Sequence, residues 1–187
     1  MSSKEILREV IAALDKARIP YMVVGSFASN LYGAGRATFD IDVVVSATPE
    51  QIRVLLSLLP TAKYYFDLDA ALVACRGKDM FNILDMEGGW KVDIIFAKTA
   101  PYHQQAFQRR IAAEIEQVPL ISATAEDTIV SKLEWAKIGE SSRQIEDVAG
   151  ILQVRGKSLD RPYIEKWVKE IGLSSEWDRA RKLASLE

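Results

Sequence analysis

The sequence predicts an α+β fold, in which a small mixed β-sheet with flanking helices is followed by a C-terminal helical bundle. The first observation is a change of pattern. Short β-branched and aromatic runs alternate with amphipathic helix patterns up to Pro119, and only helix patterns follow. The second is the segment Glu87-Gly88-Gly89 between two apolar runs, which is typical of a β-hairpin turn. We therefore expect an α+β domain over residues 1–120 and a helical subdomain over residues 121–187.

The composition is that of an ordinary globular protein. The 187 residues are 49% hydrophobic and 27% charged, which excludes general disorder. The net charge of −2 argues against a face that binds bulk nucleic acid, although a small patch for one RNA stays open. Cys75 is the single cysteine, and no apolar run reaches the ~18 residues of a membrane span. We expect a soluble cytoplasmic protein without a membrane partner.

The first half is expected to alternate between helices and strands. Thr48 and Pro49 stand at favoured positions for the start of a helix, and the run ending at Val45 is rich in β-branched residues. In chain order we expect a helix at 4–17, strands at 21–24 and 39–45 separated by a short helix at 27–32, helices at 49–59 and 67–76, and hairpin strands at 80–86 and 90–96.

The second half is expected to be helical throughout. Thr124 is a suitable N-cap for the first helix, and residues 139–142 form a turn before the second. The third helix begins at Pro162 and ends at Gly172, and a short fourth helix surrounds Trp177.

Two aspartates give the clearest chemical signal. Asp40 and Asp42 are two residues apart in a strand, so both carboxylates project from the same face. Their charges repel each other, and a divalent cation with a preference for oxygen ligands, Mg²⁺ or Mn²⁺, would relieve this repulsion. Asp93 lies in a second apolar strand, and the three carboxylates converge if the two strands are neighbours. Such a pair of aspartates is also common at solvated sheet edges, where it has no ligand.

The segment Gly25-Ser26 follows the first strand and opens a helix. A glycine allows a ligand to approach the backbone closely, and free amide groups at a helix start can hold a phosphate. By itself this turn is more typical of a structural role. The order of the turn, the aspartate pair and the third aspartate is more specific than any one of them.

These motifs resemble the DNA-polymerase-β-like nucleotidyltransferase superfamily. The matching pattern is Gly25-Ser26, thirteen intervening residues, Asp40 and Asp42 each followed by a hydrophobic residue, and Asp93 on a later strand. The segments 132–135 and 143–148 look like the helical part of small bacterial and archaeal members. Those members include the minimal nucleotidyltransferases and the AbiEii-like toxins of abortive-infection systems.

The resemblance implies a role for each matching residue. Asp40, Asp42 and Asp93 would bind metal and act in catalysis, with Asp93 assisting deprotonation of the acceptor hydroxyl. The remaining matches would bind the NTP: Gly25, Ser26, Arg36, Thr38 and Lys132. Arg36 fits an ordinary surface position equally well, and Lys132 also fits a solvated helix face.

The implied activity is transfer of a nucleoside monophosphate from NTP to a hydroxyl group, with release of pyrophosphate. The acceptor would be RNA such as tRNA, a protein or a small molecule, and a toxin with a cognate antitoxin would be one instance. Two alternatives stay open: a non-catalytic nucleotide-binding or regulatory module on the same fold, and a metal-dependent phosphodiesterase.

Overall fold

The computed structural model describes residues 3–33, 35 and 37–185. The chain divides into two compact units, Met1–Phe27 with Ala37–Ser122 and Ala28–Arg36 with Ala123–Glu187. Residues 28–36 therefore belong with the C-terminal helices, whereas the predicted division at residue 120 assigns them to the first domain.

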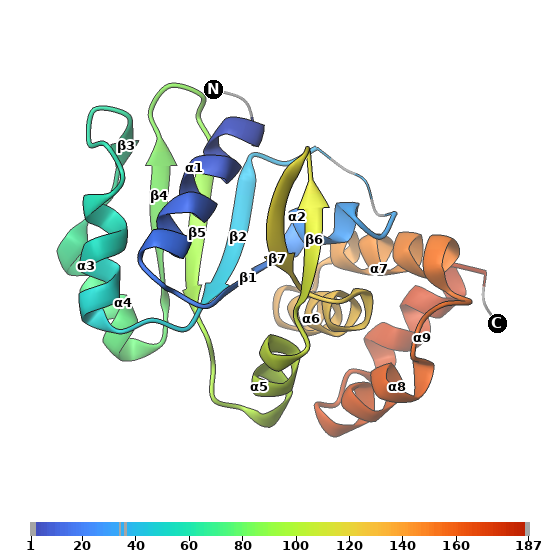
Figure 1. Ribbon diagram of the computed structural model, residues 1–187. Helices are drawn as coiled ribbons and strands as arrows, with labels where there is room; N and C mark the ends of the chain where they lie inside the picture. Colours follow the sequence, from blue (N-terminus) through green and yellow to red (C-terminus); the bar gives the residue numbers. More distant parts are fainter. Residues whose placement is uncertain (1–2, 34, 36, 186–187) are drawn as a thin grey trace. The chain divides into compact units, whose positions relative to one another are not determined.

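The first unit contains a mixed sheet of seven strands among the described residues, in the order β3-β4-β5-β2-β1-β7-β6 (Figure 1). The pairs β2–β5 and β1–β7 are parallel and the others are antiparallel. The mixed α+β architecture is as predicted. The strands are β1 (Tyr21–Val24), β2 (Asp40–Val45), β3 (Tyr64–Tyr65), β4 (Met80–Asp85), β5 (Lys91–Phe96), β6 (Ile111–Ile115) and β7 (Val118–Ser122).

Strand β2 is the middle strand of the sheet, and it contributes side chains both to the core and to a more exposed face. Ile41, Val43 and Val45 are fully buried, and they alternate with more exposed residues along the strand. Since successive side chains point to opposite faces, Asp40 and Asp42 share the face that the apolar residues leave. The core therefore fixes the direction of both carboxylates.

Helices α1 (Ser3–Lys16), α3 (Pro49–Ser57), α4 (Leu68–Gly77) and α5 (Pro101–Gln108) belong to the same unit. Helix α1 lies in front of the sheet in Figure 1 and contacts β7 and α3, while α4 contacts α3 and β4. The predicted start of α3 is confirmed, because Thr48 and Gln51 form a reciprocal capping box and Pro49 follows the cap.

Strands β6 and β7 are absent from the sequence prediction for a physical reason. Pro119 within β7 argues against a strand, because proline cannot donate a ladder hydrogen bond. The turn between the strands is formed by Glu116 and Gln117, both with positive φ (50° and 63°), where asparagine and glycine are usual. The hairpin therefore carries neither of the usual local signals.

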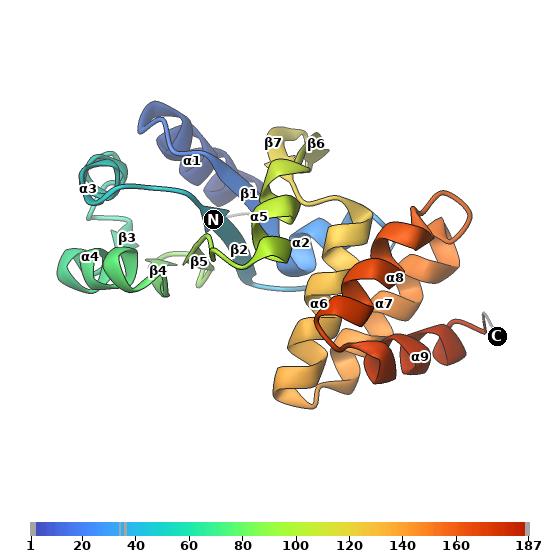
Figure 2. The ribbon, with the colours of Figure 1, turned by 90° about the horizontal axis from the view of Figure 1, so that it is seen from below.

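Within the described residues, four helices lie wholly in the second unit, and they pack against one another (Figure 2). They are α6 (Ala125–Gly139), α7 (Ser142–Arg155), α8 (Arg161–Glu170) and α9 (Ser174–Leu183). Their positions match the four predicted helices, and the predicted cap is confirmed because the Thr124 hydroxyl accepts a hydrogen bond from the Asp127 amide. Helix α2 (Gly25–Asn30) begins in the first unit and ends in the second.

Residues 28–36 attach to the helical unit through Tyr32. Its ring is buried, its hydroxyl donates to the Ala123 carbonyl at 2.6 Å, and the Arg155 guanidinium lies 5.9 Å from the ring centre. Burial raises the pKa of Tyr32 to about 12, so this hydroxyl stays protonated as a donor. The contacts are long-range, which is why the sequence does not reveal them. No helix in the described part of the chain is long and apolar enough to cross a membrane.

Candidate active site

Asp40, Asp42 and Asp93 come together on two neighbouring strands. Strands β2 and β5 are parallel and adjacent, and Asp42 is directly opposite Asp93 in the register. The three carboxylates differ in environment. Asp93 is 6% exposed, whereas the side chain of Asp40 is 53% exposed and Asp42 is intermediate. From the sequence, the three carboxylates converge only if the two strands are neighbours. The pairing of β2 with β5 meets this condition.

Lys91 places a positive charge within this group. Its Nζ lies 3.0 Å from Asp93 Oδ2 and 3.4 Å from Asp40 Oδ1. The hydrogen bond to Asp93 raises the pKa of the Lys91 ammonium despite the opposing effect of burial, so the lysine stays charged. Lys91 is not among the predicted site residues, although its position two residues before Asp93 places both on one face of β5.

Asn82 holds the other oxygen of Asp93. It lies on β4 opposite Asp93, and its side-chain amide donates to Asp93 Oδ1. Each oxygen of the Asp93 carboxylate thus has a donor, which fixes the carboxylate's orientation. Asn82 is also missing from the predicted residues. The sequence feature that could have indicated it is a polar side chain within the alternating pattern of β4.

Gly25 is required at its position by both backbone and space. It has a φ of +63°, and a Cβ atom there would lie 2.0 Å from Asp42 Oδ2. The Asp42 carboxylate therefore packs directly against the Gly25 backbone, at the junction where β1 ends and α2 begins. Ser26 follows and is buried. The predicted turn and the predicted aspartate pair are thus parts of one arrangement.

Thr38 stabilises the start of β2. Its Oγ1 accepts a hydrogen bond from the Asp40 amide at 3.1 Å and donates to the Asp40 carbonyl at 3.4 Å. This contact orients the backbone that carries Asp40, and Thr38 is half-buried. Arg36, the other residue predicted before the aspartate pair, lies outside the described residues.

Lys132 belongs to the helical unit, on α6. It is 4% exposed, and its Nζ contacts Asp147 Oδ2 at 2.6 Å and Gln144 Oε1 at 3.1 Å. The alternative of a solvated helix face is therefore wrong. Its predicted contact with a nucleotide stays a prediction.

The donor chemistry of the aspartate group fits a divalent cation with hard oxygen ligands, although the described residues contain no group of three or more His, Cys, Asp or Glu arranged to hold a metal. Asp40 and Asp42 supply carboxylates from one strand face, and the missing side chain of Gly25 leaves space for the Asp42 carboxylate. These two aspartates would hold the cation. Asp93 already receives hydrogen bonds from Asn82 and Lys91.

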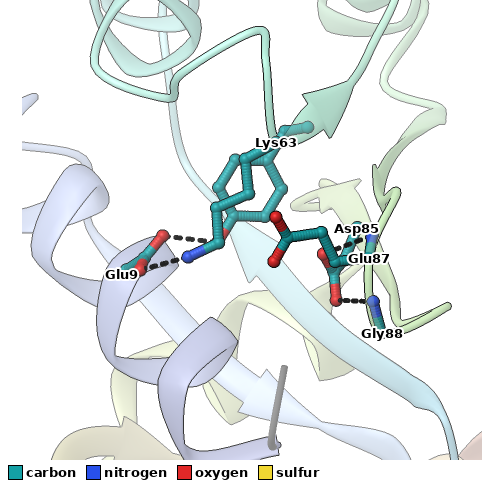
Figure 3. Close-up of polar contacts among 6 residues, drawn as sticks. Glu9, Lys63, Asp85, Glu87 and Gly88 are labelled. Carbon is teal, nitrogen blue, oxygen red and sulfur yellow. Dashed lines mark hydrogen bonds and ion pairs between the residues drawn. The ribbon is translucent and has the colours of Figure 1, made fainter.

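A second polar cluster in the first unit is accounted for by structure (Figure 3). Glu9 on α1 pairs with the Lys63 ammonium at 2.5 Å and accepts from the Tyr64 hydroxyl at 2.6 Å. Burial raises the pKa of Glu9, but the hydrogen bonds from Lys63 and Tyr64 outweigh it and the pKa is lowered overall. Nearby, Asp85 accepts from the amides of Glu87 and Gly88 at the hairpin turn. The printed contacts of Glu9 tie α1 to the segment before β4, and those of Asp85 stabilise the hairpin turn.

No protein-family model matches the chain, and no curated protein matches its sequence. Solved structures do match its fold. The crystal structure of ANT(2'')-Ia in complex with adenylyl-2''-tobramycin gives a TM-score of 0.57 at 16% identity, covering 92% of this chain and 97% of that one. The lincomycin-bound lincosamide antibiotic adenylyltransferase LnuA gives 0.55 at 10% identity, covering 82% and 98%.

A third solved structure also matches the fold. The antigenic nucleotidyltransferase-like protein from Paracoccidioides brasiliensis gives a TM-score of 0.56 at 18% identity, covering 96% of this chain and 94% of that one. The chain therefore has the nucleotidyltransferase fold. The resemblance drawn from the sequence motifs is confirmed at the level of the fold.

Proposed function

We propose that the protein is a nucleotidyltransferase that moves a nucleoside monophosphate from an NTP to a hydroxyl group and releases pyrophosphate. The observation that carries this proposal is the alignment of Asp42 with Asp93, with Gly25 packed against the Asp42 carboxylate. This arrangement combines a cation-binding pair, a third carboxylate and close backbone access in one place. The fold shared with adenylyltransferases supports the same chemistry.

Each of the site residues has a proposed role in this reaction. Asp40 and Asp42 would hold Mg²⁺ or Mn²⁺, and the backbone at Gly25 and Ser26 would approach the phosphates. A bound cation would offset the charge of the triphosphate and of the departing pyrophosphate. Asp93 accepts the proton of the acceptor hydroxyl while the new oxygen–phosphorus bond forms and the bond to pyrophosphate breaks.

The acceptor we favour is a small molecule with hydroxyl groups. ANT(2'')-Ia was solved with adenylyl-2''-tobramycin and LnuA with lincomycin, and the net charge of −2 gives no bias toward RNA. Transfer to tRNA or protein, and a toxin held by an antitoxin, are instances of the same reaction with another acceptor. The proposed compartment is the cytoplasm, where NTP is supplied.

The test is a transfer assay with each α-labelled NTP and Mg²⁺ or Mn²⁺, against panels of aminoglycosides, lincosamides, total tRNA and protein extract. We expect label in one panel and release of pyrophosphate, both abolished by EDTA and by Asp42→Asn. Asp69→Asn is the matched control, because Asp69 is an exposed aspartate on α4. Nucleotide binding without transfer in any panel would instead indicate a non-catalytic module. Hydrolysis of a phosphodiester without transfer would indicate a phosphodiesterase.

A further inference from the structure

Lys91 lies where a cation shared by Asp40 and Asp93 would bind. Its ammonium is within 3.4 Å of an oxygen of Asp40 and 3.0 Å of an oxygen of Asp93. The two carboxylates come from different strands, and Lys91 bridges them from β5. Two cations cannot occupy one position, because like charges in contact repel strongly.

The charges of the group point the same way. Lys91 offsets part of the negative charge that Asp40 and Asp93 bring to the position between them. Without the ammonium, the same position would attract a divalent cation. Asp93 also receives the Asn82 amide, so its two oxygens are engaged by protein donors.

We infer that Lys91 is a resident cation that limits the site to one divalent metal ion, held by Asp40 and Asp42. Lys91 takes the position of a second ion between Asp40 and Asp93 and keeps Asp93 oriented as a proton acceptor. It acts as a positioning residue, through Asp93. This inference rests on the proposed function, since it assigns the metal requirement of the same site.

The test counts Mn²⁺ ions on the nucleotide-free protein by equilibrium titration with electron paramagnetic resonance of the free ion. We expect at most one ion on the wild type and one more on Lys91→Met. The ion bound by Asp40 and Asp42 should bind about tenfold or more tightly in Lys91→Met, because a positive charge next to Asp40 is gone. Lys91→Gln provides the same count with a polar side chain, should Lys91→Met fail to fold.

Two controls separate position from general charge. Lys91→Arg keeps the cation and should keep the wild-type count, whereas Lys91→Met combined with Asp93→Asn should return to it, because the second ion needs Asp93. Equal counts for the wild type and for both Lys91→Met and Lys91→Gln, or two ions on the wild type, would overturn the inference. Failure of the proposed function is read separately, as absence of nucleotidyl transfer, because Mn²⁺ alone is the probe here.

Discussion

Lys91 and Lys132 each pair with aspartates, and their surroundings differ. In the helical unit, the side chains of Lys132 and Asp147 are 4% and 9% exposed and form an ion pair, with Gln144 as a further partner of the lysine. In the sheet unit, Lys91 is 38% exposed and contacts two carboxylates, with a third opposite one of them. The first pair is buried, whereas the second group brings several carboxylates together at a site that is partly open to solvent.

This difference separates a structural ion pair from a candidate ligand site. A buried pair must be balanced, because an unpaired charge in the interior costs several kcal/mol. Unbalanced carboxylates are tolerated where water or a ligand reaches them.

Removing the charge of Asp93 should give the largest change. Asp93→Asn preserves the shape of the side chain and removes the proposed proton acceptor, so single-turnover transfer should fall by ~10²–10⁴-fold while NTP affinity changes little. Asp40→Asn should weaken both, because the role we propose for Asp40 is in cation and triphosphate binding. Near-normal transfer by Asp93→Asn would show that the third carboxylate is structural.

Breaking the buried pair should cost stability and leave the sheet unit's cation site intact. Asp147→Ala leaves the Lys132 ammonium buried without this carboxylate, so the free energy of unfolding should fall by about 3–5 kcal/mol. Urea denaturation measures this loss, and the Mn²⁺ count on the folded variant should equal that of the wild type. A loss below 1 kcal/mol would contradict the structural role of the pair.

A double substitution separates stability from any nucleotide contact of Lys132. Lys132→Met combined with Asp147→Leu replaces the pair by apolar side chains of similar size and should recover most of the stability. A folded double variant with unchanged NTP affinity would remove Lys132 from the predicted binding residues. Weakened NTP affinity would retain it.

A side chain at Gly25 should act on the fold and the site together. Gly25→Ala must hold a φ of +63° and places Cβ 2.0 Å from Asp42 Oδ2, so we expect a loss of ~1–2 kcal/mol and weaker Mn²⁺ binding. The matched control is Gly77→Ala in α4, where a Cβ meets nothing within 4 Å. Its thermal midpoint should be unchanged or slightly raised. Equal behaviour of the two variants would contradict the close approach of Asp42.

The smallest effect concerns the Glu9 cluster and its dependence on pH. The folded-state pKa of Glu9 is lowered below its ordinary value of 4.5. Its contribution to stability is therefore present above pH 4.5 and is lost as the pH falls through the folded-state value. Glu9→Gln should lower the thermal midpoint slightly at neutral pH and flatten its decline below pH 4.5. The measurement is the difference in thermal midpoint between wild type and variant from neutral to acidic pH.

Much of the site follows from local sequence. Alternation along 40–45 assigns Ile41 and Val43 to the core, so Asp40 and Asp42 must share the opposite face. The hairpin at 80–96 follows from its glycine turn, and it carries Asp93 on a strand. These features depend on residues that are close together in the sequence, so hydrophobic periodicity is enough to predict them.

Other features depend on contacts between distant segments. The roles of Asn82 and Lys91 require that β4, β5 and β2 be neighbours in register, and a side chain as long as lysine finds its partners only there. The assignment of residues 28–36 to the helical unit depends on Tyr32, whose partner Ala123 is 91 residues away. Local sequence patterns do not predict β6 and β7, because Pro119 lies within β7 and the turn at Glu116-Gln117 lacks the usual glycine or asparagine.

The sequence by itself determined the secondary structure that carries the three aspartates, the glycine turn beside them and the helical second half. The tertiary structure alone decided that Asp42 is opposite Asp93, that Lys91 bridges two of the carboxylates, and that Lys132 is buried against Asp147. The physical reason is range. The direction of a side chain is set by the backbone within a few residues, whereas the charge that it meets is set by strand order and helix packing across the whole chain.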